Sequence, residues 1–243
     1  MEKYVDFAVE KTVQLLAVDS PSGFTAAAAE LVQREFEALG FRAWQTAKGG
    51  VMIDLGGTDE NDALLLEAHA DTLGGMVAEI KGSGRLRIDR LGGMNANNAE
   101  AENVRVYTRD GRMIEGTCQL CNASIHVNME YNNVKRGWDT VEIVLDEPVE
   151  SADDVKRLGI CVGDVVCFEP RTHVTSSGYI KSRFLDDKLS VGILLGFAKF
   201  LHDEKLTPSR RVYVHVTVYE EVGHGGSASV PAGVTEAISV DMG

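Results

Sequence analysis

The sequence predicts an α/β fold, a mixed sheet flanked by helices, with a β-rich domain inserted into it. Apolar strands and amphipathic helices alternate near both ends of the chain, which is typical of α/β domains. Between these parts, short β-like pieces alternate with Gly, Asn and Asp turns, and helical periodicity is nearly absent. We therefore expect an α/β part at 1–74, an inserted β-rich domain at 75–165, and a second α/β part at 166–243.

Two helices open the chain. Residues 3–18 have a helical period that places Val5, Val9, Val13 and Leu16 near one face. After a break at Ser20-Pro21-Ser22-Gly23, Thr25 caps a second helix, and Gly40 ends it.

Strands follow at about 42–47 and 50–55, joined through Lys48-Gly49-Gly50. The next strand contains the uninterrupted apolar run Leu64-Leu65-Leu66, which is typical of a central strand that is covered on both faces. This strand ends in a polar group of three residues, Glu67, His69 and Asp71.

The predicted insertion contains the β-like pieces MVAEI, RLRIDRL, NVRVYTRDG and WDTVEIVLD, and a short helix at 150–160 that Gly159 ends. In the second α/β part, a strand leads into Asp186-Asp187 and then into a helix with Val191, Leu194 and Leu195 on its apolar side. Two further strands end at Glu220-Glu221 and at Asp241.

Composition excludes several classes of protein. The net charge is −13, from 24 basic and 37 acidic residues, whereas a nucleic-acid-binding domain needs a basic surface. The N-terminal residues do not resemble a signal peptide, and no apolar run suggests a membrane span, so we expect a cytoplasmic protein. We expect the four cysteines, Cys118, Cys121, Cys161 and Cys167, to be reduced, although the first pair forms a CxxC that could hold half a zinc site or a redox pair.

Ionisable residues end four of the predicted strands: His69 with Asp71, Asp186 with Asp187, Glu220 with Glu221, and Asp241. Each group alone has an ordinary structural explanation, such as a helix cap or a solvated strand end. If the strands are parallel neighbours, however, all four groups meet at the carboxyl edge of the sheet, where α/β proteins bind ligands.

Carboxylates that crowd together repel one another unless a cation joins them. One histidine with several carboxylates suits zinc, cobalt or manganese, and a bridging carboxylate can hold two metal ions ~3.5–4 Å apart. The sequence therefore predicts a site for two divalent metal ions, with zinc favoured.

Four motifs carry a family resemblance: "AHADTLGGMV", "FLDDKLSVG", "YEEVGHGG" and "AISVDMG". In this order and at this spacing, they resemble the glutamyl/leucyl (TET-type) aminopeptidases, which are exopeptidases with two co-catalytic metal ions. The resemblance covers nearly the whole chain. It implies the zinc-exopeptidase type of α/β fold with a barrel-like insertion.

The resemblance also implies a role for six residues. His69 would bind the first metal ion, Asp71 would orient the imidazole ring, and Asp241 would complete the first metal's ligands. Asp186 would bridge both metals, and the Asp186-Asp187 peptide is typically cis in such sites. Glu220 would be the general base and Glu221 a ligand of the second metal; on an extended backbone their side chains would point to opposite sides.

This chain departs from the family pattern in two places. The residue after the aspartate of the HxD motif is usually acidic, and here it is Thr72. The family also has a histidine ligand well downstream of the strand that ends in Asp241, whereas this chain stops at Gly243. We therefore expect a C-terminally truncated form of a longer protein, or alternatively that His224 supplies the fifth ligand.

The function that these observations predict is metal-dependent hydrolysis of N-terminal peptide bonds. Two alternatives stay open: an amide deacylase or carboxypeptidase with the same metal ligands, and a catalytically impaired subunit that serves in assembly. From the resemblance we expect peptide substrates and a homo-oligomer, with dimers formed through the insertion and tetrahedral dodecamers in the full-length protein.

Overall fold

The computed structural model describes residues 1–242, and its contacts divide the chain into two compact units. One unit combines Met1–Thr72 with the segment from Pro170 onward, and the other is Leu73–Glu169. The predicted insertion, 75–165, lies within the second unit. The predicted fold class is confirmed, since the first unit is a mixed sheet with helices and the second a closed β-barrel.

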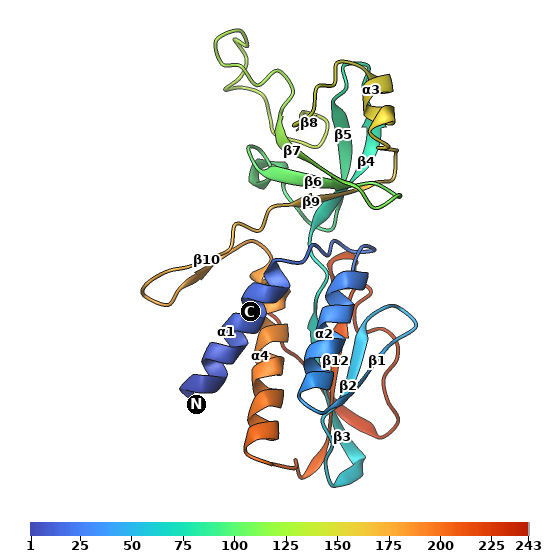
Figure 1. Ribbon diagram of the computed structural model, residues 1–243, viewed down its shortest axis with the longest axis vertical. Helices are drawn as coiled ribbons and strands as arrows, with labels where there is room; N and C mark the ends of the chain where they lie inside the picture. The colour runs from blue at the N-terminus through green and yellow to red at the C-terminus, as the bar shows by residue number, and fades with distance from the viewer. Residues whose placement is uncertain (243) are drawn as a thin grey trace. The chain divides into compact units, whose positions relative to one another are not determined.

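The first unit contains a five-stranded sheet with the order β1-β2-β12-β3-β13. Strands β12 and β13 both pair with β3 in parallel, while β2 is antiparallel to β12 and to β1 (Figure 1). Strand β3 therefore has a parallel neighbour on each side. The strand bounds are Arg42–Gln45 (β1), Val51–Asp54 (β2), Asp59–His69 (β3), Arg210–Thr217 (β12) and Val234–Ser239 (β13).

The apolar run of β3 is covered to different degrees. Leu65 is fully buried, whereas Leu64 and Leu66 are half-buried and pack against the main core, so the expected cover on both faces is only partial. The helices α2 (Ala26–Ala38) and α4 (Leu185–Asp203) contribute to that core through residues such as Phe36 and Leu195. These contacts fix the strands whose carboxyl ends form the site.

The predicted end of the second helix is confirmed. Gly40 has a φ of +83°, a left-handed conformation that glycine adopts without a steric penalty. Its N–H donates to the Glu37 carbonyl at 2.8 Å, and the Phe41 N–H donates to the Phe36 carbonyl at 3.2 Å. This pair of bonds is the Schellman motif, which satisfies carbonyls at the end of α2.

The predicted buried face of the first helix is confirmed only in part: Leu16 is buried and Val9 and Val13 are half-buried, but Val5 is exposed. In α1 (Glu2–Leu16), Val5 is 59% exposed, and the buried residues are Tyr4, Thr12, Leu15 and Leu16. The reason lies in α4, where Gly192 and Gly196 let the Tyr4–Thr12 side of α1 approach closely. A Cβ atom at Gly192 would lie 2.0 Å from the Thr12 hydroxyl, and one at Gly196 would lie 3.1 Å from the Tyr4 carbonyl.

The strand predicted directly before Asp186-Asp187 does not belong to the five-stranded sheet, so this prediction is wrong. The chain there forms a separate two-stranded hairpin of β10 (His173–Val174) and β11 (Ile180–Lys181). Its turn contains Gly178, whose φ is +88°. The segment then passes through Phe184, with a left-handed φ of 65°, and enters α4 directly.

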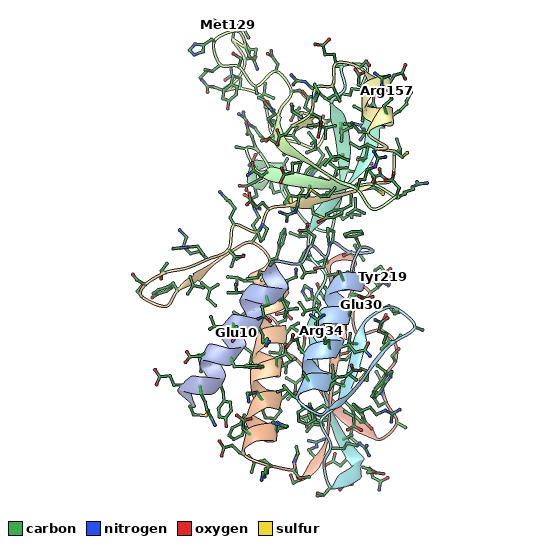
Figure 2. The ribbon with its side chains drawn as sticks, viewed as in Figure 1. Glu10, Glu30, Arg34, Met129, Arg157 and Tyr219 are labelled. Carbon is green, nitrogen blue, oxygen red and sulfur yellow. The ribbon has the colours of Figure 1, made fainter. Side chains whose placement is uncertain are left out.

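The second unit is a barrel of six strands in the order β4-β5-β8-β7-β6-β9. The expected short helix is present as α3 (Ala152–Arg157), and Gly159 follows it with a φ of +89°. A long connection after β7 carries Met129, which is 89% exposed (Figure 2). The barrel strands are Gly74–Ile80 (β4), Leu86–Leu91 (β5), Asn103–Tyr107 (β6), Met113–Leu120 (β7), Val141–Leu145 (β8) and Val165–Phe168 (β9).

Within residues 1–242, the structure has no helix that is both long enough and apolar enough to cross a membrane. The four cysteines are free thiols; Cys118 and Cys167 are buried, and Cys161 is exposed. Cys118 belongs to the buried alternation of β7, whereas Cys121 lies just beyond that strand. Its thiol receives a contact of 3.5 Å from the Lys81 ammonium.

Candidate metal centre

Three parallel strands bring their carboxyl ends, and the residues that follow them, to one edge of the sheet. His69 is the last residue of β3, Glu220 follows β12, and Asp241 follows β13. Together with Thr217 and Ser239, these residues line one small cavity of about 50 Å³. The edge predicted from the sequence therefore exists, but it is formed by three strand ends and the first turn of a helix rather than by four strands.

His69 is held from its Nδ1 side. The buried imidazole places Nδ1 3.0 Å from the backbone carbonyl of Asp71 and 3.4 Å from the Asp71 carboxylate. An N–H at Nδ1 would therefore leave Nε2 as the ring's lone-pair donor, the arrangement usual for metal-binding histidines. Nε2 faces two acids, Asp186 Oδ1 at 3.0 Å and Glu220 Oε2 at 3.6 Å.

Asp71 connects the ends of two strands. Its carboxylate, fully buried, accepts the backbone N–H of Glu220 at 3.2 Å and that of Glu221 at 3.3 Å. The Ser22 hydroxyl donates to the same carboxylate at 2.5 Å. Ser22 was not among the predicted site residues, because its sequence neighbourhood indicates only a break between helices.

The loop that contains Ser22 also fixes the end of β3. The Ser20 hydroxyl donates to the Ala70 carbonyl at 2.7 Å, and the Thr72 N–H donates to the Ser20 carbonyl at 2.9 Å. Thr72, which stands where the family pattern has an acid, is itself buried. The first loop of the chain therefore positions the HxD segment.

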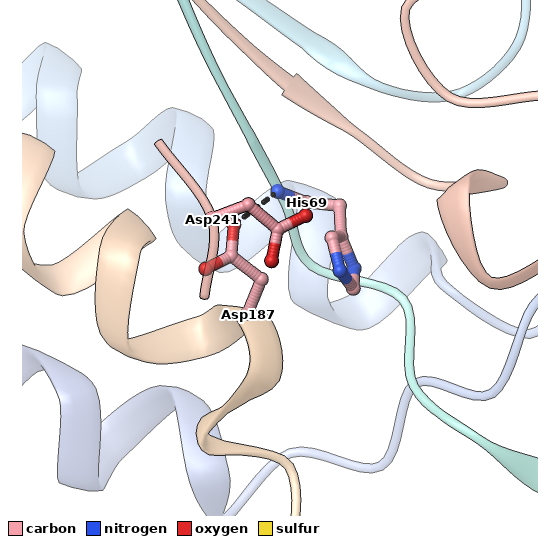
Figure 3. Close-up of side chains that lie close together, drawn as sticks. All are labelled: His69, Asp187 and Asp241. Carbon is pink, nitrogen blue, oxygen red and sulfur yellow. Dashed lines mark hydrogen bonds between the residues drawn. The ribbon is translucent and has the colours of Figure 1, made fainter. Parts of the chain in front are cut away.

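Asp186 and Asp187 open α4, and the peptide bond between them is cis, as the family resemblance implied. Asp186 approaches the His69 ring, whereas the buried Asp187 accepts the backbone N–H of His69 at 3.0 Å. His69, Asp187 and Asp241 each offer a ligand atom, and these atoms lie within 4.8 Å of one another (Figure 3). Asp187 was absent from the predicted ligands, so the structure adds a carboxylate to the site.

The extended geometry expected for Glu220-Glu221 is wrong. β12 ends at Thr217, and the two acids belong to a 3₁₀ turn, Glu220–Val222. The alternation of side chains along a strand therefore does not separate their directions. Instead, the Asp71 carboxylate holds both backbone N–H groups, and Gly223, with a φ of 80°, lets the chain turn away.

The electrostatics of the site reflect several acids around one imidazole. Burial raises the pKa of Glu221 to about 7; the charge of His69 opposes this, while Asp186, Asp71 and Glu220 add to it. Burial likewise raises the pKa of Asp187 to about 6, against hydrogen bonds from Ser190 and His69. Burial disfavours the charged imidazole, but the Asp71 carboxylate outweighs it and raises the pKa of His69 to about 10.

These groups fit a divalent metal ion. Their donor atoms are one imidazole nitrogen and several carboxylate oxygens, the set that zinc, cobalt and manganese accept. Burial is the largest cause of the raised pKa values of two of these carboxylic acids, and neighbouring acids add to it, so the positive charge of the described residues does not balance them. A bound cation would remove this deficit.

The structure places His224 in the loop after the 3₁₀ turn, with its side chain exposed. Lys48 anchors this loop by donating to the His224 carbonyl and, at 3.0 Å, to the Ser227 hydroxyl. Among residues 1–242, the group able to hold a metal contains His69, Asp187 and Asp241 and does not include His224. The alternative in which His224 supplies a fifth ligand gains no support from this arrangement.

Solved structures of aminopeptidases have the same fold as this chain. A TET aminopeptidase from a marine sediment Thaumarchaeota archaeon superposes with a TM-score of 0.85 at 22% identity, over 98% of this chain and 66% of that one. An aminopeptidase from Desulfurococcus kamchatkensis gives a TM-score of 0.82 at 24% identity, over 97% of this chain and 63% of that one. This chain therefore has the fold of these aminopeptidases.

The sequence assigns the family. Residues 49–243 match the model of the M42 glutamyl aminopeptidases, and the chain belongs to this peptidase family. YhfE of Bacillus subtilis, named provisionally as an aminopeptidase, is 38% identical over 97% of this chain and 69% of its own length. The glutamyl aminopeptidase of Lactococcus lactis is 25% identical, over 90% of this chain and 61% of that protein. The chain thus spans between about three fifths and seven tenths of the length of these two relatives.

Proposed function

We propose that the protein is a metal-dependent aminopeptidase that removes N-terminal residues from peptides. The observation that carries the proposal is the meeting of His69 with acids from three other segments at the carboxyl edge of the sheet, in a chain of the M42 family. The relatives named glutamyl and lysyl aminopeptidase support the reaction class rather than an acyl-amide or carboxypeptidase specificity.

In this proposal, His69, Asp186, Glu221 and Asp241 hold two divalent metal ions, and Asp187 adds a further carboxylate at the same place. Zinc is the favoured metal, with cobalt and manganese as alternatives, because all three accept nitrogen and oxygen donors. When bound, such ions polarise a carbonyl group and lower the pKa of water.

Glu220 is the proposed general base. Its carboxylate lies 3.6 Å from His69 Nε2 and lines the cavity at the sheet edge, where a reacting water and the scissile carbonyl would sit. It takes a proton from the water and delivers it to the nitrogen of the leaving amine. Asp71 contributes by position: it holds the His69 ring and the backbone of both glutamates.

We also propose that the protein is a homo-oligomer, with dimers formed through the insertion at 75–165. A relative in fold, the TET1 peptidase of Pyrococcus horikoshii, can assemble into a tetrahedron or a large octahedral shell. Its TM-score is 0.80 at 24% identity, over 96% of this chain and 68% of that one.

The test is the variant Glu220→Gln, assayed on aminoacyl-nitroanilides with cobalt or zinc added. General acid–base groups contribute roughly 10²–10⁴-fold to rate, so kcat should fall by about that factor. Metal content, measured by elemental analysis, should equal that of the wild type, because Glu220 holds no metal in this scheme. Glu30→Gln, at an exposed position of α2, is the matched control and should keep wild-type turnover (Figure 2). Near-normal turnover of Glu220→Gln would remove the assignment.

A further inference from the structure

A second cavity lies in the first unit, at the hairpin that precedes α4. It encloses about 610 Å³, which is within the range of small-molecule sites. Four of its lining residues are basic: Arg171, His173, Lys181 and Arg183. Among the described residues that line it, none is Asp or Glu, although the chain has 37 acidic residues and a net charge of −13. Basic side chains are therefore concentrated at this cavity.

The hairpin register explains how two of the basic side chains, His173 and Lys181, reach one cavity. His173 pairs with Lys181, and the neighbouring pair Thr172 and Ser182 joins hydroxyl to hydroxyl at 2.8 Å. The basic residues at 173 and 181 therefore belong to one face of the hairpin and the hydroxyls to the other. The pairing places the His173 imidazole and the Lys181 ammonium side by side, where one anion could accept hydrogen bonds from both.

The ends of the hairpin are conformationally unusual. Arg171 and Phe184 both have left-handed backbones, with φ of 51° and 65°. Such conformations in non-glycine residues cost energy and are concentrated at functional sites. They direct the chain into and out of the two strands that line the cavity.

The cavity and the candidate metal centre share one segment of chain. Leu185 lines the cavity, and the next residue, Asp186, contacts the His69 ring. Since the Cα atoms of consecutive residues are about 3.8 Å apart or less, the wall of the cavity and the metal centre are adjacent at this point of the chain. The basic cavity is thus placed to contact the part of a substrate that does not react.

The metal centre and the hairpin cavity favour ligand groups of opposite charge. The metal centre is rich in carboxylates, whereas the hairpin cavity is cationic and would repel the positively charged N-terminal amine of a peptide. A short peptide has the complementary polarity, with an ammonium group at one end and a carboxylate at the other. A nucleic acid does not fit, because a protein with a net charge of −13 repels its phosphates.

We propose that the cavity lined by Arg171, His173, Lys181 and Arg183 binds a carboxylate of the peptide substrate, on the C-terminal side of the bond that is cleaved. The inference rests on the proposed aminopeptidase function. It makes the protein selective for short or acidic peptides, because their carboxylates reach the cavity while the N-terminus occupies the metal centre.

Two pairs of peptides test the inference, each beginning with the residue whose nitroanilide is cleaved fastest. The first pair is X-Ala-Ala as free acid and as amide, which reports the terminal carboxylate. The second pair is X-Ala-Glu-amide and X-Ala-Gln-amide, which reports a side-chain carboxylate. In at least one pair the acidic peptide should have a kcat/KM about tenfold higher, the effect of one charge-assisted contact, and the preference should decline as salt rises.

In Lys181→Met and His173→Gln the ratio between acidic and neutral peptides should fall toward one. Lys135→Met, which removes an exposed lysine of the other unit, should keep the wild-type ratio. Calorimetric titration of Glu220→Gln with the same pairs measures the affinity of each peptide without turnover. The acidic peptide should bind with the same tenfold preference. If the nitroanilides are not cleaved, only the proposed function is refuted. The binding measurement still tests the inference in that case.

A wild type that cleaves nitroanilides but does not distinguish either pair, in kcat/KM or in binding, would overturn the inference and leave the proposed function standing. An altered oligomeric state of Lys181→Met, with the ratio unchanged, would also overturn it. That outcome would assign the basic residues to an acidic surface of a second copy.

Discussion

The α/β unit and the barrel each bury carboxylates, but they neutralise them differently. In the barrel, Glu142 is almost fully buried and contacts Lys81 at 2.9 Å and Arg85 at 2.5 Å. Burial alone would raise its pKa, yet these two cations lower it below the usual range. At the sheet edge of the α/β unit, burial and mutual repulsion prevail, and the pKa values of Asp187 and Glu221 rise to about 6 and about 7.

The difference distinguishes a structural ion pair from the proposed metal site. A buried acid with lysine and arginine partners is neutralised by the protein's own side chains, without an ion from solution. Acids that share one imidazole retain repulsion that only protons or a metal ion relieve. The same residue types therefore have different electrostatic surroundings in the two units, and experiments can test this difference.

The largest expected effect is on stability when metal is added. A ligand that binds only the folded state at about 1,000 times its Kd stabilises by about 4 kcal/mol, so cobalt or zinc should raise the thermal midpoint well above its value in chelator. His69→Gln should lose this increase because it removes the imidazole ligand. Glu142→Gln, the matched change in the barrel, should keep it. Equal midpoints with metal and with chelator would contradict the assignment of the site.

The pH dependence of the metal-free protein should have opposite signs in the two units. Folded-state pKa values are raised for Asp187, Glu221 and His69, so their contribution is largest at low pH and is lost as pH rises through about 6, 7 and 10. Because a metal ion displaces these protons, its affinity should increase with pH. Denaturant unfolding with chelator, repeated from pH 5 to pH 9, and metal titrations over the same range measure both trends.

In the barrel, the contribution of Glu142 is present above its unfolded pKa of 4.5 and is lost as pH falls through its lower folded value. Glu142→Gln should cost about 2 kcal/mol at neutral pH, less than a fully buried pair, because Arg85 is 42% exposed and can turn to solvent. The variant should also lose less stability than the wild type on acidification. Glu115→Gln, at an exposed position of β7, is the control and should behave as the wild type.

How much could be predicted from the sequence depends on how far apart in the sequence the contacting residues lie. Apolar periodicity along β3, β12 and β13 is local, and with it the meeting of His69, Glu220 and Asp241 at one edge was predictable. The turn at Glu220-Glu221 was not, because the group that fixes it is Asp71, about 150 residues earlier in the chain. Ser22 was missed for the same reason, and Asp187 was expected at this edge but not as a ligand: their partners at the site lie far away in sequence.

Asp71 combines features of both units: it is a fully buried acid that accepts hydrogen bonds from the neutral Ser22 hydroxyl and two backbone N–H groups, and the His69 imidazole lies 3.4 Å from its carboxylate. Ser22→Ala removes the hydroxyl that donates to its carboxylate at 2.5 Å. Groups that hold metal ligands from behind typically change affinity by 10–100-fold, so metal affinity should fall by about tenfold, or about 1.4 kcal/mol.

Ser20→Ala is the matched control for this prediction, because it removes a buried hydroxyl of the same loop that donates to the Ala70 carbonyl instead. Both variants should lower the free energy of unfolding by about 1 kcal/mol, the typical value of one hydrogen bond. Only Ser22→Ala should weaken metal binding in calorimetric titrations, since only its hydroxyl reaches Asp71. Equal metal affinities in the two variants would mean that the loop supports the fold of the HxD segment without tuning its charge.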